Sequence, residues 1–112
     1  MKYIKNIEDA RKERLKKLKR KYEEEIKTIK SIAKNFKLKR VYIFGSFING
    51  NYHFNSDIDI AVEGIDYSEF LKFYSVLLKK ISLPIDVKIY EDFKPEIQKD
   101  IKRKGKIVYE KK

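Results

Sequence analysis

The chain has 112 residues, of which 42% are hydrophobic and 40% are charged. This length corresponds to one domain, and this hydrophobic share suffices for a buried core beneath an ionic surface. The absence of cysteine excludes a disulfide framework and a thiolate zinc site, and the single histidine, His53, excludes a multi-histidine metal site. No apolar run approaches the roughly 20 residues of a membrane span, and the residues after Met1 do not form a signal peptide. We therefore expect a cytoplasmic protein with no membrane association.

The net charge of +11 is unevenly distributed along the chain. Residues 1–40 carry 16 Lys/Arg and 6 Asp/Glu, residues 41–93 carry 4 and 8, and residues 94–112 carry 8 and 3. An acidic centre suits a metal site, and basic ends attract nucleotide triphosphate, nucleic acid or an acidic protein. Solubility explains the basic ends equally well.

The first predicted element is a helix from about Ile7 to Phe36, either continuous or with one break. Apolar residues recur at helical spacing, namely Ile7, Leu15, Leu18, Tyr22, Ile26, Ile29, Ala33 and Phe36. Asn6 is a candidate N-cap. The stretch from Arg11 to Lys21 is very basic and sparse in apolar residues, so we expect it to project from the body or to pack on a partner. A nucleic-acid-binding arm is the alternative.

Two predicted strands follow, VYIF at residues 41–44 and DIDIAV at residues 57–62. Strand side chains alternate between faces, so Asp57 and Asp59 share one face and the isoleucines take the other. Two adjacent carboxylates repel each other unless a proton or a cation lies between them, and Mg²⁺ prefers oxygen ligands of this kind. An inert Asp-x-Asp on a solvent-facing strand is the alternative interpretation.

A turn at Gly45-Ser46 ends the first of these strands. A backbone without a Cβ can approach a phosphate closely, with the Ser46 hydroxyl and nearby N–H groups as donors. A plain turn is the alternative. The P-loop is excluded because Asn51-Tyr52 stands where Lys-Ser/Thr is required, and an EF-hand is excluded because Ala61 takes a ligand position.

The remaining elements are predicted from periodicity and breakers. They are a helix over Tyr67–Ser82, a strand over Ile85–Tyr90, a helix over Glu91–Lys104 and an edge strand over Ile107–Tyr109. Asp86 lies on the polar face of the third strand. If that strand pairs beside the second, Asp86 converges with the two earlier carboxylates. A surface residue at the start of a strand is the alternative.

Gly45-Ser46, ten further residues and Asp57-x-Asp59 resemble the signature of the DNA polymerase β-type nucleotidyltransferase superfamily. The short chain is similar to the minimal nucleotidyltransferases, which include the MntA-type antitoxins that pair with HEPN-domain toxins. The resemblance implies an α+β fold, with a small mixed β-sheet, helices packed on one side and a long N-terminal helix. We expect residues 1–36 to form that basic helix, as part of the same domain, and residues 37–112 to form the minimal nucleotidyltransferase domain.

The resemblance also implies the site and its chemistry. The Gly45-Ser46 pair would hold the nucleotide phosphates, and Asp57, Asp59 and Asp86 would bind two Mg²⁺ as the catalytic carboxylates. The activity implied is transfer of AMP from ATP to a hydroxyl. By the MntA likeness, the acceptor is a tyrosine of a HEPN toxin, which makes the protein the antitoxin of a type VII toxin–antitoxin system.

One departure from the family pattern keeps other hypotheses open. Many members carry Arg one or three residues after the Ser, where this chain has Phe47 and Asn49. A catalytically silent antitoxin that neutralises its partner by contact alone is the second hypothesis. A nucleic-acid-binding module that uses the basic N-terminal helix is the third.

Overall fold

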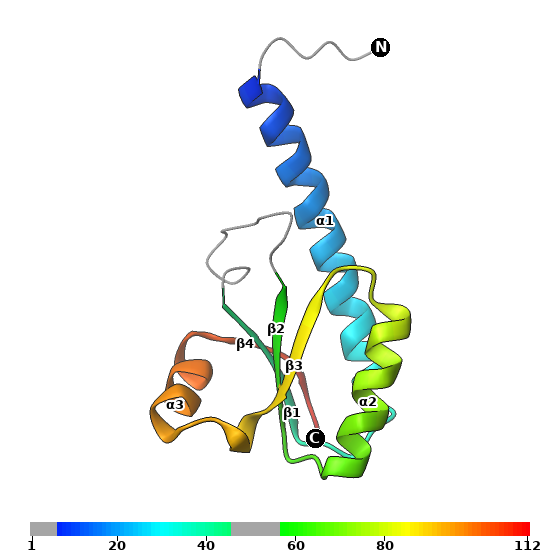
Figure 1. Ribbon diagram of the computed structural model, residues 1–112, viewed down its shortest axis with the longest axis vertical. Coiled ribbons are helices and arrows are strands. Elements are labelled where there is room, and N and C mark those ends of the chain that lie inside the picture. The colour runs from blue at the N-terminus through cyan, green and yellow to red at the C-terminus, as the bar shows by residue number, and fades with distance from the viewer. Residues whose placement is uncertain (1–6, 46–56) are drawn as a thin grey trace.

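The computed structural model describes residues 7–45 and 57–112. The elements in chain order are α1 (Ile7–Ala33), β1 (Arg40–Phe44), β2 (Ile58–Glu63), α2 (Tyr67–Lys80), β3 (Ile85–Ile89), the 3₁₀ turn η1 (Tyr90–Asp92), α3 (Pro95–Lys104) and β4 (Lys106–Glu110). The four strands form one sheet in the order β3-β2-β1-β4 (Figure 1). β2 and β3 run parallel, whereas the other two pairs are antiparallel. The predicted mixed sheet is confirmed.

The main hydrophobic core lies between one face of the sheet and the helices α1 and α2. Alternation along the strands sends every second apolar side chain to this face. The core includes Ile29 and Ala33 of α1, Val41 and Ile43 of β1, Ile58, Ile60 and Val62 of β2, Phe73 and Leu77 of α2, and Val87 of β3. Ile58 and Ile60, which alternate with the aspartates, are fully buried, and the predicted separation of isoleucines and aspartates onto two faces is confirmed.

The third helix lies on the opposite side of the sheet. A smaller cluster there joins Tyr42, Ala61, Tyr90 and Ile101, and the rings of Tyr42 and Tyr90 stack with centroids 5.3 Å apart. The expectation that helices pack on one side is thus confirmed for α1 and α2, while α3 covers part of the other face (Figure 1). This leaves the rest of that face available for a site.

α1 is a single continuous helix, and its buried residues all lie in its second half. Its buried residues are Tyr22, Glu25, Ile29 and Ala33. The turns before Tyr22 extend beyond the sheet (Figure 1), as predicted for this basic stretch. The candidate N-cap Asn6 lies outside the described residues. None of the described helices combines the length and apolarity that crossing a membrane would require.

Several predicted boundaries were wrong, among them the ends of the first two helices, which lie at Ala33 and Lys80 instead of Phe36 and Ser82. The last helix begins at Pro95 rather than Glu91, because the chain first forms η1 and then continues through an extended Lys94, which is the N-cap. Proline at N1 is favourable, since its missing N–H has no partner in the first turn. The second strand begins at Ile58, so Asp57 immediately precedes the strand instead of lying within it.

Candidate active site

Two of the predicted carboxylates are neighbours on the open face of the sheet. Parallel pairing of β2 and β3 sets Asp59 directly across from Asp86, and residues paired in this way point to the same face. Asp57 has an exposed side chain one residue before β2. The structure therefore brings together acidic residues that are 27 positions apart in the sequence.

The pKa of Asp59 is raised by the surroundings of its side chain. Partial burial raises the pKa of the Asp59 carboxyl above its ordinary value, and the negative charges of Asp86 and Asp57 raise it further. Like charges in proximity disfavour ionisation, whereas a cation between them favours it. Partial burial and the two acidic neighbours therefore disfavour the ionised form of Asp59.

The glycine turn lies against Asp59. Phe44, the last residue of β1, pairs with Asp59, and the next residue, Gly45, has φ +87. A Cβ at Gly45 would collide with Oδ2 of Asp59 and would lie 3.2 Å from its Cγ. Only glycine leaves room for the carboxylate here. Ser46, the predicted phosphate donor that follows, lies outside the described residues, as do Phe47 and Asn49.

Lys88 is the one described basic side chain that the structure pairs with this cluster. Its Nζ lies 3.6 Å from Oδ2 of Asp86, and its charge partly offsets the rise in the pKa of Asp59. The ammonium group also lies 6.0 Å from the ring centroid of Phe93. Sequence reasoning gave Lys88 no role, although its position two residues after Asp86 already put both on one strand face.

Glu63 is a second carboxylate on the same face of β2, and its surroundings differ from those of Asp59. Burial alone would raise the pKa of Glu63, but hydrogen bonds donated by Tyr42 and Arg40 lower it below its ordinary value. The Tyr42 hydroxyl donates to Oε1 over 2.7 Å and Arg40 over 3.2 Å. Arg40 also pairs with Glu110. Glu63 is therefore satisfied by its structural partners, whereas Asp59 is not.

The chemistry of the donor set fits Mg²⁺. In residues 7–45 and 57–112, no three acidic, histidine or cysteine side chains stand together as a ready-made metal site. The three predicted aspartates nevertheless offer only carboxylate oxygens, which this ion prefers together with water and substrate phosphates. The pKa of Asp59 is raised, and a cation bound beside it would favour the ionised carboxylate and so lower that pKa.

The fold agrees with that of a nucleotidyltransferase domain. Residues 27–112 match the family described as "Polymerase beta, Nucleotidyltransferase". The match covers well over half of the chain, so the protein belongs to this family.

Individual relatives agree with this assignment. The chain is 40% identical over 47 residues to "Putative protein adenylyltransferase MJ1215" of Methanocaldococcus jannaschii, covering 42% of this chain and 55% of that protein. The matched part thus spans about half the length of this curated relative. A solved "putative minimal nucleotidyltransferase" shares the fold with a TM-score of 0.67 at 19% identity, covering 79% of this chain and 93% of that one. A mutant of the toxin–antitoxin MntA-HpeT is 27% identical with a TM-score of 0.59, over 77% and 72% of the two chains.

Proposed function

We propose that the protein transfers AMP from ATP to a hydroxyl group at the cluster formed by Asp57, Asp59 and Asp86. The observation that carries the proposal is the register of β2 and β3, which sets Asp59 beside Asp86. Membership of the nucleotidyltransferase family supports the reaction class. The M. jannaschii relative, named as a protein adenylyltransferase, supports AMP as the group transferred.

The three aspartates would hold Mg²⁺. When bound, Mg²⁺ would neutralise charge on the triphosphate and favour ionisation of the acceptor hydroxyl. In this proposal Asp59 takes the central part, which is supported by the charges of both other carboxylates acting on it and by the contact of Gly45 with it. Without a bound cation, partial burial and the neighbouring carboxylates disfavour the ionised form of Asp59.

The residues around the cluster would position the triphosphate. The backbone at Gly45-Ser46 offers the close approach that a phosphate needs. Lys88 supplies positive charge on the same face, where family members with Arg after the Ser would supply it from the turn. We therefore assign Lys88 the task of binding the nucleotide phosphates in this chain.

The reaction forms one bond and breaks one. The acceptor oxygen attacks the α-phosphorus, the bond from that phosphorus to the bridging oxygen breaks, and pyrophosphate leaves while the hydroxyl proton passes to solvent. Catalysis of this kind depends mainly on positioning and charge neutralisation. The site needs no histidine or cysteine nucleophile, and none is found among its described residues.

The acceptor in this proposal is a tyrosine of a HEPN-type toxin. The likeness to the MntA-HpeT toxin–antitoxin structure supports a toxin partner, and the protein adenylyltransferase relative supports a protein acceptor. In this reading the protein is the antitoxin, and modification silences the toxin.

The test is label transfer to the co-purified partner. With Mg²⁺ present, ATP labelled at the α-phosphate should label the partner, whereas ATP labelled at the γ-phosphate should not. Asp86→Asn should abolish transfer. Asp100→Asn removes the same charge from an exposed position on α3 and should leave transfer unchanged. Labelling from the γ-phosphate, or full activity of Asp86→Asn, would refute adenylyl transfer at this cluster.

A silent binding antitoxin is the second candidate. Two observations favour it, namely the absence of Arg at positions 47 and 49 and the pairing of Lys88 with Asp86. It predicts that wild type and Asp86→Asn neutralise the partner equally and that neither labels it. Loss of neutralisation in Asp86→Asn would exclude this candidate.

A further inference from the structure

A stripe of exposed lysines runs along one side of α1. Its members are Lys12, Lys16, Lys19, Lys27 and Lys30, spaced at intervals that keep them on one helical face. Only Glu23 interrupts them on that face. At 1.5 Å per residue the stripe is about 27 Å long. It flanks the buried face, so packing of α1 leaves it in solvent.

None of the described acidic side chains forms an ion pair with this stripe. No ion pair within the described residues involves these five lysines, although other lysines are paired, such as Lys21 with Glu25 at 3.3 Å and Lys72 with Glu69 at 3.8 Å. Unpaired lysines along one line repel one another, and a polyanion would relieve that repulsion.

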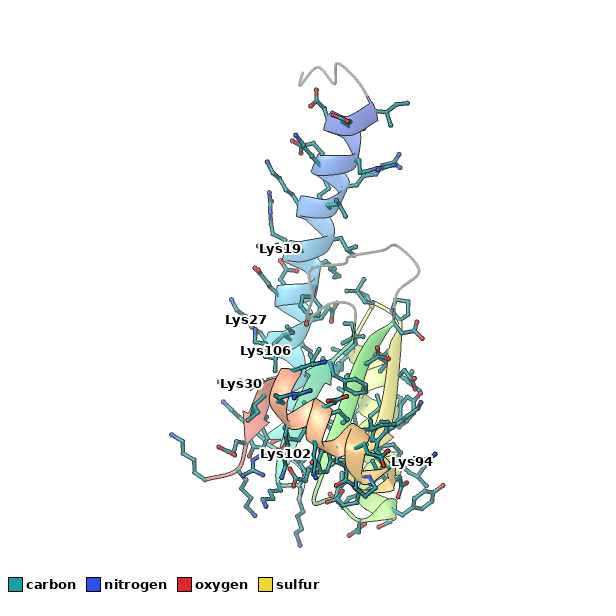
Figure 2. The ribbon with its side chains drawn as sticks, turned by 90° about the vertical axis from the view of Figure 1, so that its left-hand side faces the viewer. Lys19, Lys27, Lys30, Lys94, Lys102 and Lys106 are labelled. Carbon is teal, nitrogen blue, oxygen red and sulfur yellow. The ribbon has the colours of Figure 1, made fainter. Side chains whose placement is uncertain are left out.

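The edge of the sheet extends this basic surface. α1 packs beside the edge strand β4, and a hollow of about 480 Å³ lies between them, lined by Lys30, Lys34, Ile107, Val108, Tyr109, Glu110 and Lys112. Its only acid, Glu110, is paired with Arg40. Figure 2 shows labelled lysines along this side of the molecule, namely Lys19, Lys27 and Lys30 of α1, Lys106 of β4, Lys102 of α3, and Lys94, the N-cap of α3.

The composition of this surface suits a nucleic acid better than a protein. Protein interfaces are depleted in lysine and centred on aromatic anchors. The opposite edge of the sheet has that character, with a hollow of about 270 Å³ whose lining includes Tyr67, Phe70 and Phe93. Lysines act as flexible point charges, which suits a regular row of phosphates without base recognition.

We propose that the lysine stripe of α1 and the hollow between α1 and β4 bind the phosphate backbone of a nucleic acid, independently of its sequence. This activity is separate from the aspartate cluster, which none of these lysines joins. The protein would then carry a nucleotide site at one part of the sheet and a nucleic-acid surface at its β4 edge.

The experiment is fluorescence anisotropy of the full chain with labelled duplexes of about 20 base pairs and with the corresponding single strand, between about 50 and 300 mM KCl. The stripe variant is Lys19→Gln/Lys27→Gln/Lys30→Gln. The matched control, Lys72→Gln/Lys79→Gln/Lys80→Gln, removes the same charge from exposed positions of α2. Circular dichroism checks the fold of both.

Wild type should bind duplexes of different sequence with similar affinity, and single strands of different sequence likewise. Its affinity should fall as the salt concentration rises. The stripe variant should bind about tenfold weaker or worse, with a log–log salt slope smaller by about 3, while the control stays within about twofold of wild type. If the stripe variant does not fold, Lys16→Gln/Lys19→Gln lies in the half of α1 without buried residues and should decrease the salt slope by about 2.

Three results would overturn the proposal. The first is no binding at low salt, and the second is equal weakening in the stripe variant and the control, which would indicate an effect of net charge alone. The third is displacement of the nucleic acid by polyglutamate at equal charge concentration, which would identify an acidic protein as the better occupant. Retention of binding when polyglutamate is added supports nucleic acid.

Discussion

Two acidic residues on one face of β2, Glu63 and Asp59, have opposite electrostatic environments. Glu63 accepts hydrogen bonds from Tyr42 and Arg40, and its pKa is lowered. Asp59 has two acidic neighbours, and its pKa is raised. Partial burial and the charges of Asp86 and Asp57 disfavour the ionised form of Asp59, and a carboxyl group perturbed in this way is a candidate for a functional site.

The first prediction concerns Asp59 and pH. Because its folded-state pKa lies above the ordinary value of 3.8, its favourable contribution is present below that value and is lost as pH rises through the raised pKa. Asp59→Asn should therefore raise the Tm at pH 7 by roughly 2–5 °C and have little effect near about pH 3. Thermal denaturation at both pH values measures this. A variant that is less stable than wild type at pH 7 would contradict it.

The second prediction compares two glycines with left-handed backbones, Gly45 at φ 87 and Gly64 at φ 75. Alanine at either position should cost about 1–3 kcal/mol because of strain. Only Gly45→Ala also pushes on the Asp59 carboxylate, so it alone should weaken ATP binding. Urea denaturation and ATP titration separate the two effects. Equal ATP affinity of both variants would show that the turn does not shape the site.

At the scale of single residues, the sequence predicted which face of a strand each side chain occupies, but not which side chains are in contact. Alternation along the strands correctly placed Asp59 and Asp86 on the polar faces of their strands, because the direction of a side chain follows from its position in a strand. The approach of Gly45 to Asp59 and the ion pair from Lys88 to Asp86 depend on how strands twist and pair, which a single sequence does not encode locally. Ser46 stays a prediction, since it lies outside the described residues.

At the scale of elements, the parallel pair β2–β3 positions the site and α1 secures the core behind it. Periodicity, short apolar runs and helix breakers predicted all three helices and four strands. The start of α3 was missed, because η1 and the extended Lys94 occupy residues that are compatible with a helix in isolation. Glu25 of α1 also accepts hydrogen bonds from Ser82, tying α1 to the loop after α2, which no pattern indicated.

The third prediction tests the division of α1 into an anchored and a projecting half. Ile29 is fully buried, so Ile29→Ala should cost about 2–5 kcal/mol. Leu15 lies in the half without buried residues, so Leu15→Ala should cost less than about 1 kcal/mol. Chemical denaturation of the two variants gives both values. Similar losses would mean that the first half packs on the body as firmly as the second.

At the scale of the whole molecule, charge is segregated. The sheet carries the acidic cluster where β2 meets β3, and lysines gather along α1 and the β4 edge (Figure 2). The sequence predicted this segregation from composition alone, because 16 of 28 basic residues fall in residues 1–40. It did not predict that the stripe and β4 form one surface, since that requires the packing of α1.

The fourth prediction follows from the net charge of +11. Self-repulsion destabilises a compact state, and salt screens it over about 10 Å at 0.1 M. Raising NaCl from about 0.05 to about 0.5 M should therefore increase the Tm by a few degrees. The increase should be smaller for Lys19→Gln/Lys27→Gln/Lys30→Gln. A Tm that falls with salt would show that the surface ion pairs outweigh the repulsion.

The central claim is that Asp57, Asp59 and Asp86 act as one site for ATP and a divalent cation. Calorimetric titration of ATP into the protein with Mg²⁺ present tests it most directly, because it needs neither a partner nor turnover. We predict saturable binding to wild type and to Asp100→Asn, and binding weakened by at least about tenfold in Asp86→Asn, a loss of about 1.4 kcal/mol or more. Binding of equal strength to wild type and Asp86→Asn would contradict the claim.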